Sequence, residues 1–109
     1  MTLGLIRVGN LGTYVELDIS DTNTSDINVV LDISGATVKQ ITFIDPDGIQ
    51  TIIAANFVNN GTDGKMYVTT STTGAGLWTK AGIWKWYGTV FLAGGVVVST
   101  NDVIREVLE

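Results

Sequence analysis

Asp45 and Asp47 are the residues whose type and spacing come closest to acid–base chemistry. The chain of 109 residues has no histidine and no cysteine. This excludes Ser-His-Asp and Cys-His nucleophilic sites and most zinc or iron centres. The two carboxylates flank Pro46 in the sequence Asp45-Pro46-Asp47-Gly48, where aspartate is favoured because its side chain bonds to the turn backbone. We therefore predict a structural turn here, no catalytic residues and no enzymatic activity.

A second group of oxygen-bearing side chains resembles the start of a calcium loop. It runs over Asp21-Thr22-Asn23-Thr24-Ser25, with Asp32 farther along. Asp26 stands where such a loop needs glycine, and Asp32 is shorter than the bidentate glutamate that usually closes it. Turn chemistry accounts for the same residues. We expect no bound metal and no other cofactor.

The aromatic residues near the C-terminal end are the candidates for binding. Trp84 and Trp86 are two apart, so on a strand they share one face, and Tyr87 lies on the other. Trp84 is predicted to fill the core. Trp86 has two interpretations, core or interface, because neighbouring indoles on one face are a large volume for a small domain. Trp78 lies in a polar stretch and is expected to be exposed, so the candidate interface residues are Trp78, Trp86 and Tyr87.

The elements that position these residues are predicted to be strands. The chain is 45% hydrophobic and 16% charged, with 13 glycines and one proline, which is typical of a folded domain of strands and tight turns. The length suits one domain over residues 1–109. The clearest pattern is Thr13–Ile19, where Val15, Leu17 and Ile19 alternate with polar residues and are expected to face the core.

Turn signals divide the rest of the chain into further strands. The Pro-Asp-Gly turn predicts a hairpin within Thr37–Val58, Asn59–Gly64 a second turn, and Ala93-Gly94-Gly95 a third. Ser20–Asn28 is predicted to be an exposed loop and Ser71–Gly82 a loop or short helical turn. About seven to eight strands spaced by turns predict an all-β fold, a single antiparallel sandwich. The remaining strands are expected at Leu3–Val8, Val29–Ile33, Met66–Thr70, Ile83–Leu92 and Val96–Leu108.

The charge distribution limits the class of partner. The net charge is −5 and the six basic residues are scattered singly, whereas phosphate binding needs clustered lysine and arginine. No run approaches the ~20 apolar residues of a membrane helix, and the first residues lack the pattern of a secretory signal. We expect neither nucleic acid nor membrane as a partner.

Four short motifs together resemble a known family. They are Val8–Thr13 followed by Val15-Glu16-Leu17, then Asp32–Val38, then Ile44–Gly48, then Lys80–Lys85. In this order they are similar to small phage virion proteins, in particular the N-terminal Ig-like domain of the phage baseplate upper protein family. The resemblance covers nearly the whole chain. It implies an Ig-like β-sandwich that docks onto other tail components, with no catalysis and no cofactor.

The resemblance implies a location in the virion and protein partners. Our first hypothesis is a structural protein of a tailed phage, an adaptor or attachment subunit at the tail, baseplate or fibre junction. It would contact other virion proteins and form a symmetric homo-oligomer once assembled. A capsid decoration protein is the alternative within this class. A module binding cell-surface carbohydrate, with Trp78 or Tyr87 as a stacking platform, is the alternative outside it.

Overall fold

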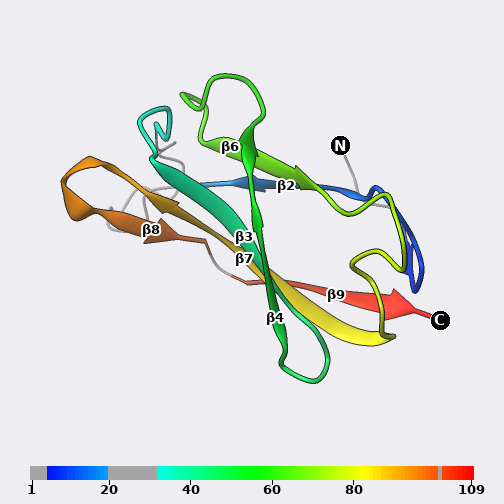
Figure 1. Ribbon diagram of the computed structural model, residues 1–109. Helices are drawn as coiled ribbons and strands as arrows, with labels where there is room; N and C mark the ends of the chain where they lie inside the picture. Colours follow the sequence, from blue (N-terminus) through cyan, green and yellow to red (C-terminus); the bar gives the residue numbers. More distant parts are fainter. Residues whose placement is uncertain (1–4, 20–31, 101) are drawn as a thin grey trace.

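The computed structural model describes residues 5–19, 32–100 and 102–109. Within these ranges the chain is nearly all-β, with two sheets packed in a curled, sandwich-like arrangement and no α-helix. Figure 1 shows β3 and β7 running side by side through the molecule, with β2 and β6 in the other layer. The prediction of an all-β sandwich is confirmed at this level.

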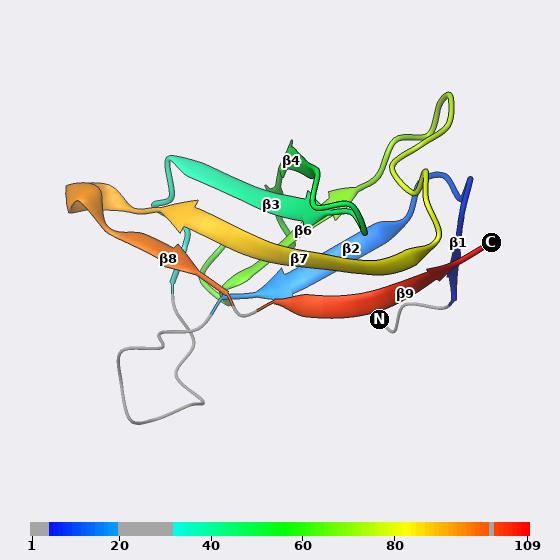
Figure 2. The same cartoon turned by 90° about the horizontal axis from the view of Figure 1, so that it is seen from below.

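The larger sheet has six strands in the order β1-β9-β7-β3-β4, with β8 also paired to β7. β7 is the longest strand and pairs with β3, β8 and β9. Figure 2, seen from below, shows β8 and β9 following one another along β7. The strands are β1 (Ile6–Arg7), β3 (Val38–Ile44), β4 (Gln50–Ala54), β7 (Gly82–Phe91), β8 (Val97–Ser99) and β9 (Val103–Leu108).

The smaller sheet has three antiparallel strands in the order β2-β6-β5. They are β2 (Tyr14–Asp18), β6 (Lys65–Thr69) and β5 (Asn56–Phe57). The chain passes from the large sheet to the small one at Ala55, between β4 and β5. At this crossover the Lys39 ammonium lies 4.3 Å from the centre of the Phe57 ring, a cation–π contact between the two sheets.

The core lies between the sheets and follows the predicted alternation. Val15 and Leu17 on β2 and Met66 and Val68 on β6 are buried, and so are Ile41 and Phe43 on β3 and Trp84, Trp86 and Val90 on β7. Gly88 faces the small sheet, where an added Cβ would collide with the Met66 methyl group and reach 3.0 Å from Leu17 Cδ1. The glycine lets the sheets approach closely at the middle of β7.

Several predicted boundaries are corrected by the structure. The sheets are not purely antiparallel, because β1 pairs in parallel with β9. The predicted strand Val96–Leu108 is two strands, β8 and β9, and the return strand of the hairpin divides into β4 and β5. The described residues form nine short strands, and Ala93–Gly95 is a single 3₁₀ turn. Ala55 lies in the core and Ile53 and Phe57 pack against it, so alternate residues face inward from β4 into β5 although the chain changes sheets at Ala55.

Two predictions fall largely on residues 20–31. The loop Ser20–Asn28 and all but the last two residues of the predicted strand Val29–Ile33 lie outside the described residues. Ile33 itself is buried and is not in a strand, and its N–H donates to the Gly61 carbonyl at 2.8 Å.

Candidate functional site

Trp78 is buried, which corrects the prediction that it is exposed. Its side chain is 0% exposed, and its ring centre lies 5.1 Å from that of Trp84 and 5.8 Å from that of Phe43, both edge-on. The indole N–H donates to Thr13 Oγ1 at 3.0 Å, so the polar end of the ring has a partner although it is buried. Trp78 therefore closes one end of the core and is not available to a partner.

Trp86 also belongs to the core. It is 1% exposed and its ring lies 5.6 Å from Phe43 and 5.7 Å from Trp78. Of its two interpretations, the structure selects the core, and the expected contact role for this residue is wrong. The polar loop misled the prediction for Trp78, because neighbours in sequence do not report what packs on a side chain. Large side-chain volume argued against burial of neighbouring indoles in a small domain, yet the core holds Trp78, Trp84 and Trp86 together with Phe43.

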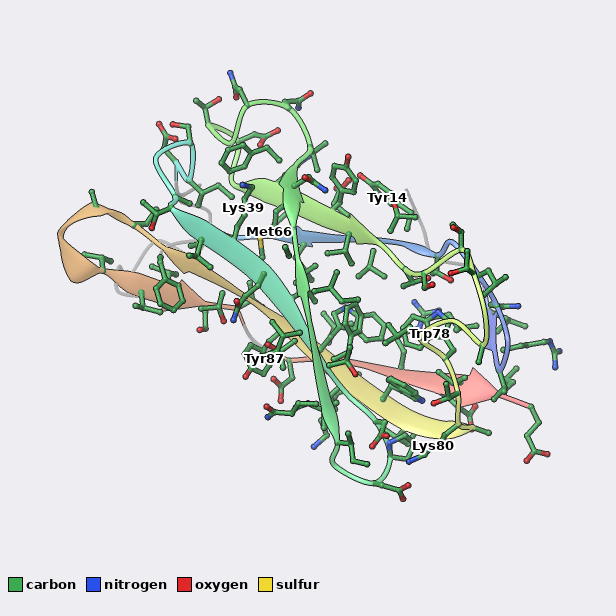
Figure 3. All side chains as sticks on the ribbon, in the orientation of Figure 1. Tyr14, Lys39, Met66, Trp78, Lys80 and Tyr87 are labelled. Carbon is green, nitrogen blue, oxygen red and sulfur yellow. The ribbon has the colours of Figure 1, made fainter. Side chains whose placement is uncertain are left out.

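Tyr87 lies on the opposite side of β7 from the tryptophans. It is half-buried on the outer face of the large sheet, where Thr42 on β3 is its direct cross-strand neighbour. In Figure 3 Tyr14 and Tyr87 lie well apart on the molecule, and Trp78 lies away from both labelled tyrosines. Of the three predicted interface residues, only Tyr87 is on the surface.

The outer face of the large sheet carries exposed apolar side chains that the sequence analysis did not collect into a site. Val38, Phe91 and Val97 are direct cross-strand neighbours and form a row at one end. Nearer the other end, the row of Ile52, Thr42 and Tyr87 runs beside a row of Ile44, Lys85 and Ile104. The exposed apolar residues of this face are Val38, Ile52, Ile83, Phe91, Val97 and Ile104.

The Asp45–Gly48 turn holds a cluster of three charges. Lys80 Nζ donates to Asp45 Oδ2 at 3.2 Å and to Asp47 Oδ2 at 2.6 Å, and Figure 3 shows Lys80 beside this turn. Asp45 Oδ1 accepts the N–H groups of Asp47 and Ile49, each at 2.9 Å. Pro46 packs on Gly82, where an added Cβ would approach Pro46 Cγ to 2.9 Å. The turn is thereby attached to the start of β7.

The pKa shifts of this cluster follow from its contacts. Burial raises the pKa of the Asp45 carboxyl, but hydrogen bonds from Ile49, Lys80 and Asp47 lower it more, and the pKa lies below its ordinary value. Hydrogen bonds to Asp47 and then to Asp45 raise the pKa of Lys80. The Asp45 carboxylate therefore stays charged and hydrogen-bonded near neutral pH, which suits a fixed turn rather than a proton donor. The bonds from the Asp47 and Ile49 N–H groups to Asp45 Oδ1 confirm that the aspartate side chain bonds to the turn backbone.

Tyr14 and Tyr67 form a second surface feature that the sequence analysis did not identify. Their rings stack with centres 5.1 Å apart on the outer face of the small sheet. The Tyr14 hydroxyl donates to Glu16 Oε1 at 2.8 Å, and burial followed by this hydrogen bond raises the pKa of Tyr14. The cross-strand register brings these rings together. Tyr67 lies directly opposite Glu16, so it is the diagonal neighbour of Tyr14 on the same face of the sheet.

The predicted ion loop lies mostly beyond what the structure describes. Asp21–Ser25 is outside the described residues, and Asp32 Oδ1 accepts the Ser34 N–H at 2.9 Å in a local turn. Within residues 5–19, 32–100 and 102–109, no group of three or more acidic side chains is placed to hold a metal ion. In the same ranges no helix is long and apolar enough to cross a bilayer.

Comparison of the chain with protein-family models, curated proteins and solved structures found no match.

Proposed function

We propose that this chain is an immunoglobulin-like β-sandwich that acts as a non-enzymatic structural protein of a tailed-phage virion. It serves as an adaptor or attachment subunit at the tail, baseplate or fibre junction and works through protein–protein contacts. The four motifs quoted from the sequence, among them Asp32–Val38 and Ile44–Gly48, support the assignment to the virion. The strand order supports the immunoglobulin-like topology, and the exposed apolar side chains of the large sheet support action through protein–protein contacts.

Strand order supports the immunoglobulin-like topology. In that fold the strands B, E and D form one sheet, while C′, C, F and G form the other. The small sheet here has the order β2-β6-β5 and the large sheet contains β4-β3-β7-β9. Both orders follow if β2 is strand B, β3 is C, and β4, β5, β6 and β7 are C′, D, E and F. β8 and β9, which pair with successive parts of β7, then share the place of strand G. The antibody-type disulfide is replaced by aliphatic and aromatic packing, since the chain has no cysteine.

The exposed apolar face of the large sheet is the observation that carries the proposed mode of action. Its exposed apolar side chains form two groups, one of Val38, Phe91 and Val97 and one that includes Ile52 and Ile104, with the polar row of Gln40, Thr89 and Ser99 between them. Exposed apolar groups of this kind mark interaction sites. The face carries three charged residues, Arg7, Lys85 and Glu106, whereas the whole chain has a net charge of −5. Such a surface matches a protein partner, because apolar contacts need little desolvation of charge.

Quantitative mass spectrometry of purified particles, with heads and tails separated, tests the location. A few to some tens of copies in the tail fraction support the adaptor or baseplate role. Hundreds of copies in the head fraction support a capsid decoration protein instead. Absence of the chain from particles overturns the virion proposal.

A matched pair of variants tests the surface. We expect Ile104→Lys to reduce incorporation into particles, because it places a charge in the apolar face. Thr69→Lys introduces the same charge on the exposed end of β6 in the small sheet and is expected to leave incorporation unchanged. Equal loss in both variants, or none in either, contradicts a contact through the large sheet.

Binding of cell-surface carbohydrate is a second candidate, favoured by the Tyr14–Tyr67 stack beside Glu16. Aromatic faces and a neighbouring carboxylate are groups to which a sugar stacks and donates hydrogen bonds. Of the two stacking platforms expected from the sequence, Trp78 is buried and therefore excluded, and Tyr87 remains on the surface. A glycan array read with the unaltered chain and with Tyr67→Ala tests this function: binding lost in the variant supports it, and no binding by either excludes it.

A further inference from the structure

β4 has a free hydrogen-bonding edge at one side of the large sheet, and most of its residues are exposed. β4 is the last strand of the large sheet and pairs only with β3. We propose that two copies of this chain associate by pairing their β4 strands antiparallel across a two-fold axis at Ile52. The pairing is a property of the isolated chain, so it goes beyond the proposed function and does not depend on a virion.

The hydrogen bonds of the hairpin identify which backbone groups are free. The Asp45 N–H donates to the Ile49 carbonyl and the Ala55 N–H donates to the Lys39 carbonyl. In an antiparallel pair alternate residues bond to the same neighbour. With the observed register, residues 51 and 53 also bond to β3. The N–H and C=O groups of Gln50, Ile52 and Ala54 therefore point away from the sheet.

The edge lacks the features that normally prevent pairing. Ile49–Val58 contains no charged residue, no glycine and no proline. Natural edge strands are protected by charges, proline, bulges or covering segments, and an uncharged run with high β-propensity favours strand addition. Ile52 is 57% exposed. None of these protective features is present along β4, so the edge is available for a partner strand.

The other free edges are less suited to a second copy. β2 is an edge of the small sheet, and it carries Glu16 and Asp18. Antiparallel self-pairing centred on Glu16 would place two carboxylates opposite each other, which is destabilising. β1 and β5 have two residues each, and β8 has three. β4 is the longest uncharged edge among the described strands.

The sequence of β4 is compatible with its own antiparallel copy. A two-fold axis at Ile52 places Ile52 opposite the same residue of the second copy and Gln50 opposite Ala54. Each such pair exchanges two backbone hydrogen bonds, and the small Ala54 leaves room for the longer Gln50. The row of Ile52, Thr42 and Tyr87 then continues across the axis onto the second copy. The contact is isologous, as a closed dimer requires.

The net charge of the chain favours association of two copies through an uncharged segment such as β4. Each copy carries a net charge of −5, so association is least unfavourable where neither copy presents a charge. The uncharged β4 segment meets this condition.

Sedimentation equilibrium of the isolated chain and amide hydrogen exchange test the pairing. We expect a monomer–dimer equilibrium, and exchange of the Ile52 and Ala54 N–H groups that slows as the protein concentration rises. The N–H groups of Glu16 and Asp18, on the free edge of β2, are the internal control and should not change. A chain that stays monomeric at about 500 μM overturns the proposal, because the dissociation constant of the dimer would then be too high for the pairing to be useful.

Variants separate the edge from the apolar face. Ile52→Glu should weaken dimerisation at least about tenfold, because it places two carboxylates beside the axis. Ile52→Pro should do the same by removing an outward N–H that β3 does not use. Ile104→Glu adds the same charge to the outer face, where Ile104 is 59% exposed, and should leave the dimer intact.

The outcomes are distinct. Loss of the dimer in Ile104→Glu with retention in Ile52→Glu places the contact on the outer face and overturns edge pairing. A dimer that survives all three substitutions also overturns it. Fluorescence of the buried tryptophans reports whether each variant is folded. Amide hydrogen exchange of the unaltered chain tests the pairing even if a variant fails to fold.

Discussion

The outer faces of the two sheets differ in chemistry although both cover the same core. The small sheet presents tyrosines, charged side chains and polar residues, among them Tyr14, Glu16, Asp18 and Lys65. The large sheet presents more exposed aliphatic side chains, among them Val38, Ile52, Val97 and Ile104, beside polar residues and the charged Arg7, Lys85 and Glu106. Strand alternation requires only one buried face per sheet, so the second apolar face is not needed for the sandwich. This difference is the basis of the proposed contact through the large sheet.

The largest expected effect lies beneath both faces, at Trp78. Trp78→Ala should lower the free energy of unfolding by about 3–5 kcal/mol, because truncating a buried tryptophan leaves a cavity. Urea denaturation followed by circular dichroism measures the loss. Tyr87→Ala, on the surface, is the control and should cost much less. Equal losses would contradict the separation of core and surface aromatics.

Acid should weaken the turns of both sheets. The pKa of Asp45 in the large sheet and of Asp63 in the small sheet lies below the ordinary value, for Asp63 through hydrogen bonds from Asn59 and then Lys65. A lowered pKa in the folded state contributes stability above the unfolded pKa, which is lost as pH falls through the folded pKa. We expect the free energy of unfolding to fall below about pH 4. Thermal unfolding from pH 2 to pH 7 measures it.

Asp45→Asn tests how much of the acid sensitivity comes from the turn of the large sheet. The amide oxygen can still accept from the turn backbone but carries no charge for Lys80, so the variant should be less stable at neutral pH. Its stability should also depend less on pH below about 4. An unchanged pH dependence would show that Asp45 does not contribute.

The tyrosine stack should contribute a smaller amount to the small sheet. Tyr67→Ala should destabilise the domain by about 0.5–1.5 kcal/mol beyond the loss of buried area, the usual value for an aromatic pair. A double-mutant cycle with Tyr14→Ala isolates the interaction between the rings. A coupling energy near zero would leave the small face with no stabilising aromatic pair.

The smallest expected effect on stability is on the apolar face. Ile104→Thr should change the free energy of unfolding by no more than about 0.5 kcal/mol, as for most exposed positions. The same denaturation experiment measures this. A loss of several kcal/mol would mean that the face serves folding, and the contrast between the two sheets would lose its functional meaning.

Local patterns in the sequence determined much of the fold. The alternation over Thr13–Ile19 predicted the buried face of β2, and Asp45–Gly48 predicted the hairpin, because both signals depend on residues adjacent in the chain. The predicted strand Met66–Thr70 likewise matches β6 closely. The absence of histidine and cysteine from the sequence excluded the commonest catalytic groups without any structure.

Tertiary structure alone decided what these elements contact. Polar neighbours in the sequence predict an exposed Trp78, yet it is buried because Phe43 on the distant strand β3 and Trp84 and Trp86 on β7 pack around it. The parallel pairing of β1 with β9 joins the two ends of the described chain. The apolar outer face likewise exists only through the register between β3, β7 and their neighbours. Local sequence specifies which residues share a strand face, whereas long-range pairing determines whether that face meets the core, a partner or water.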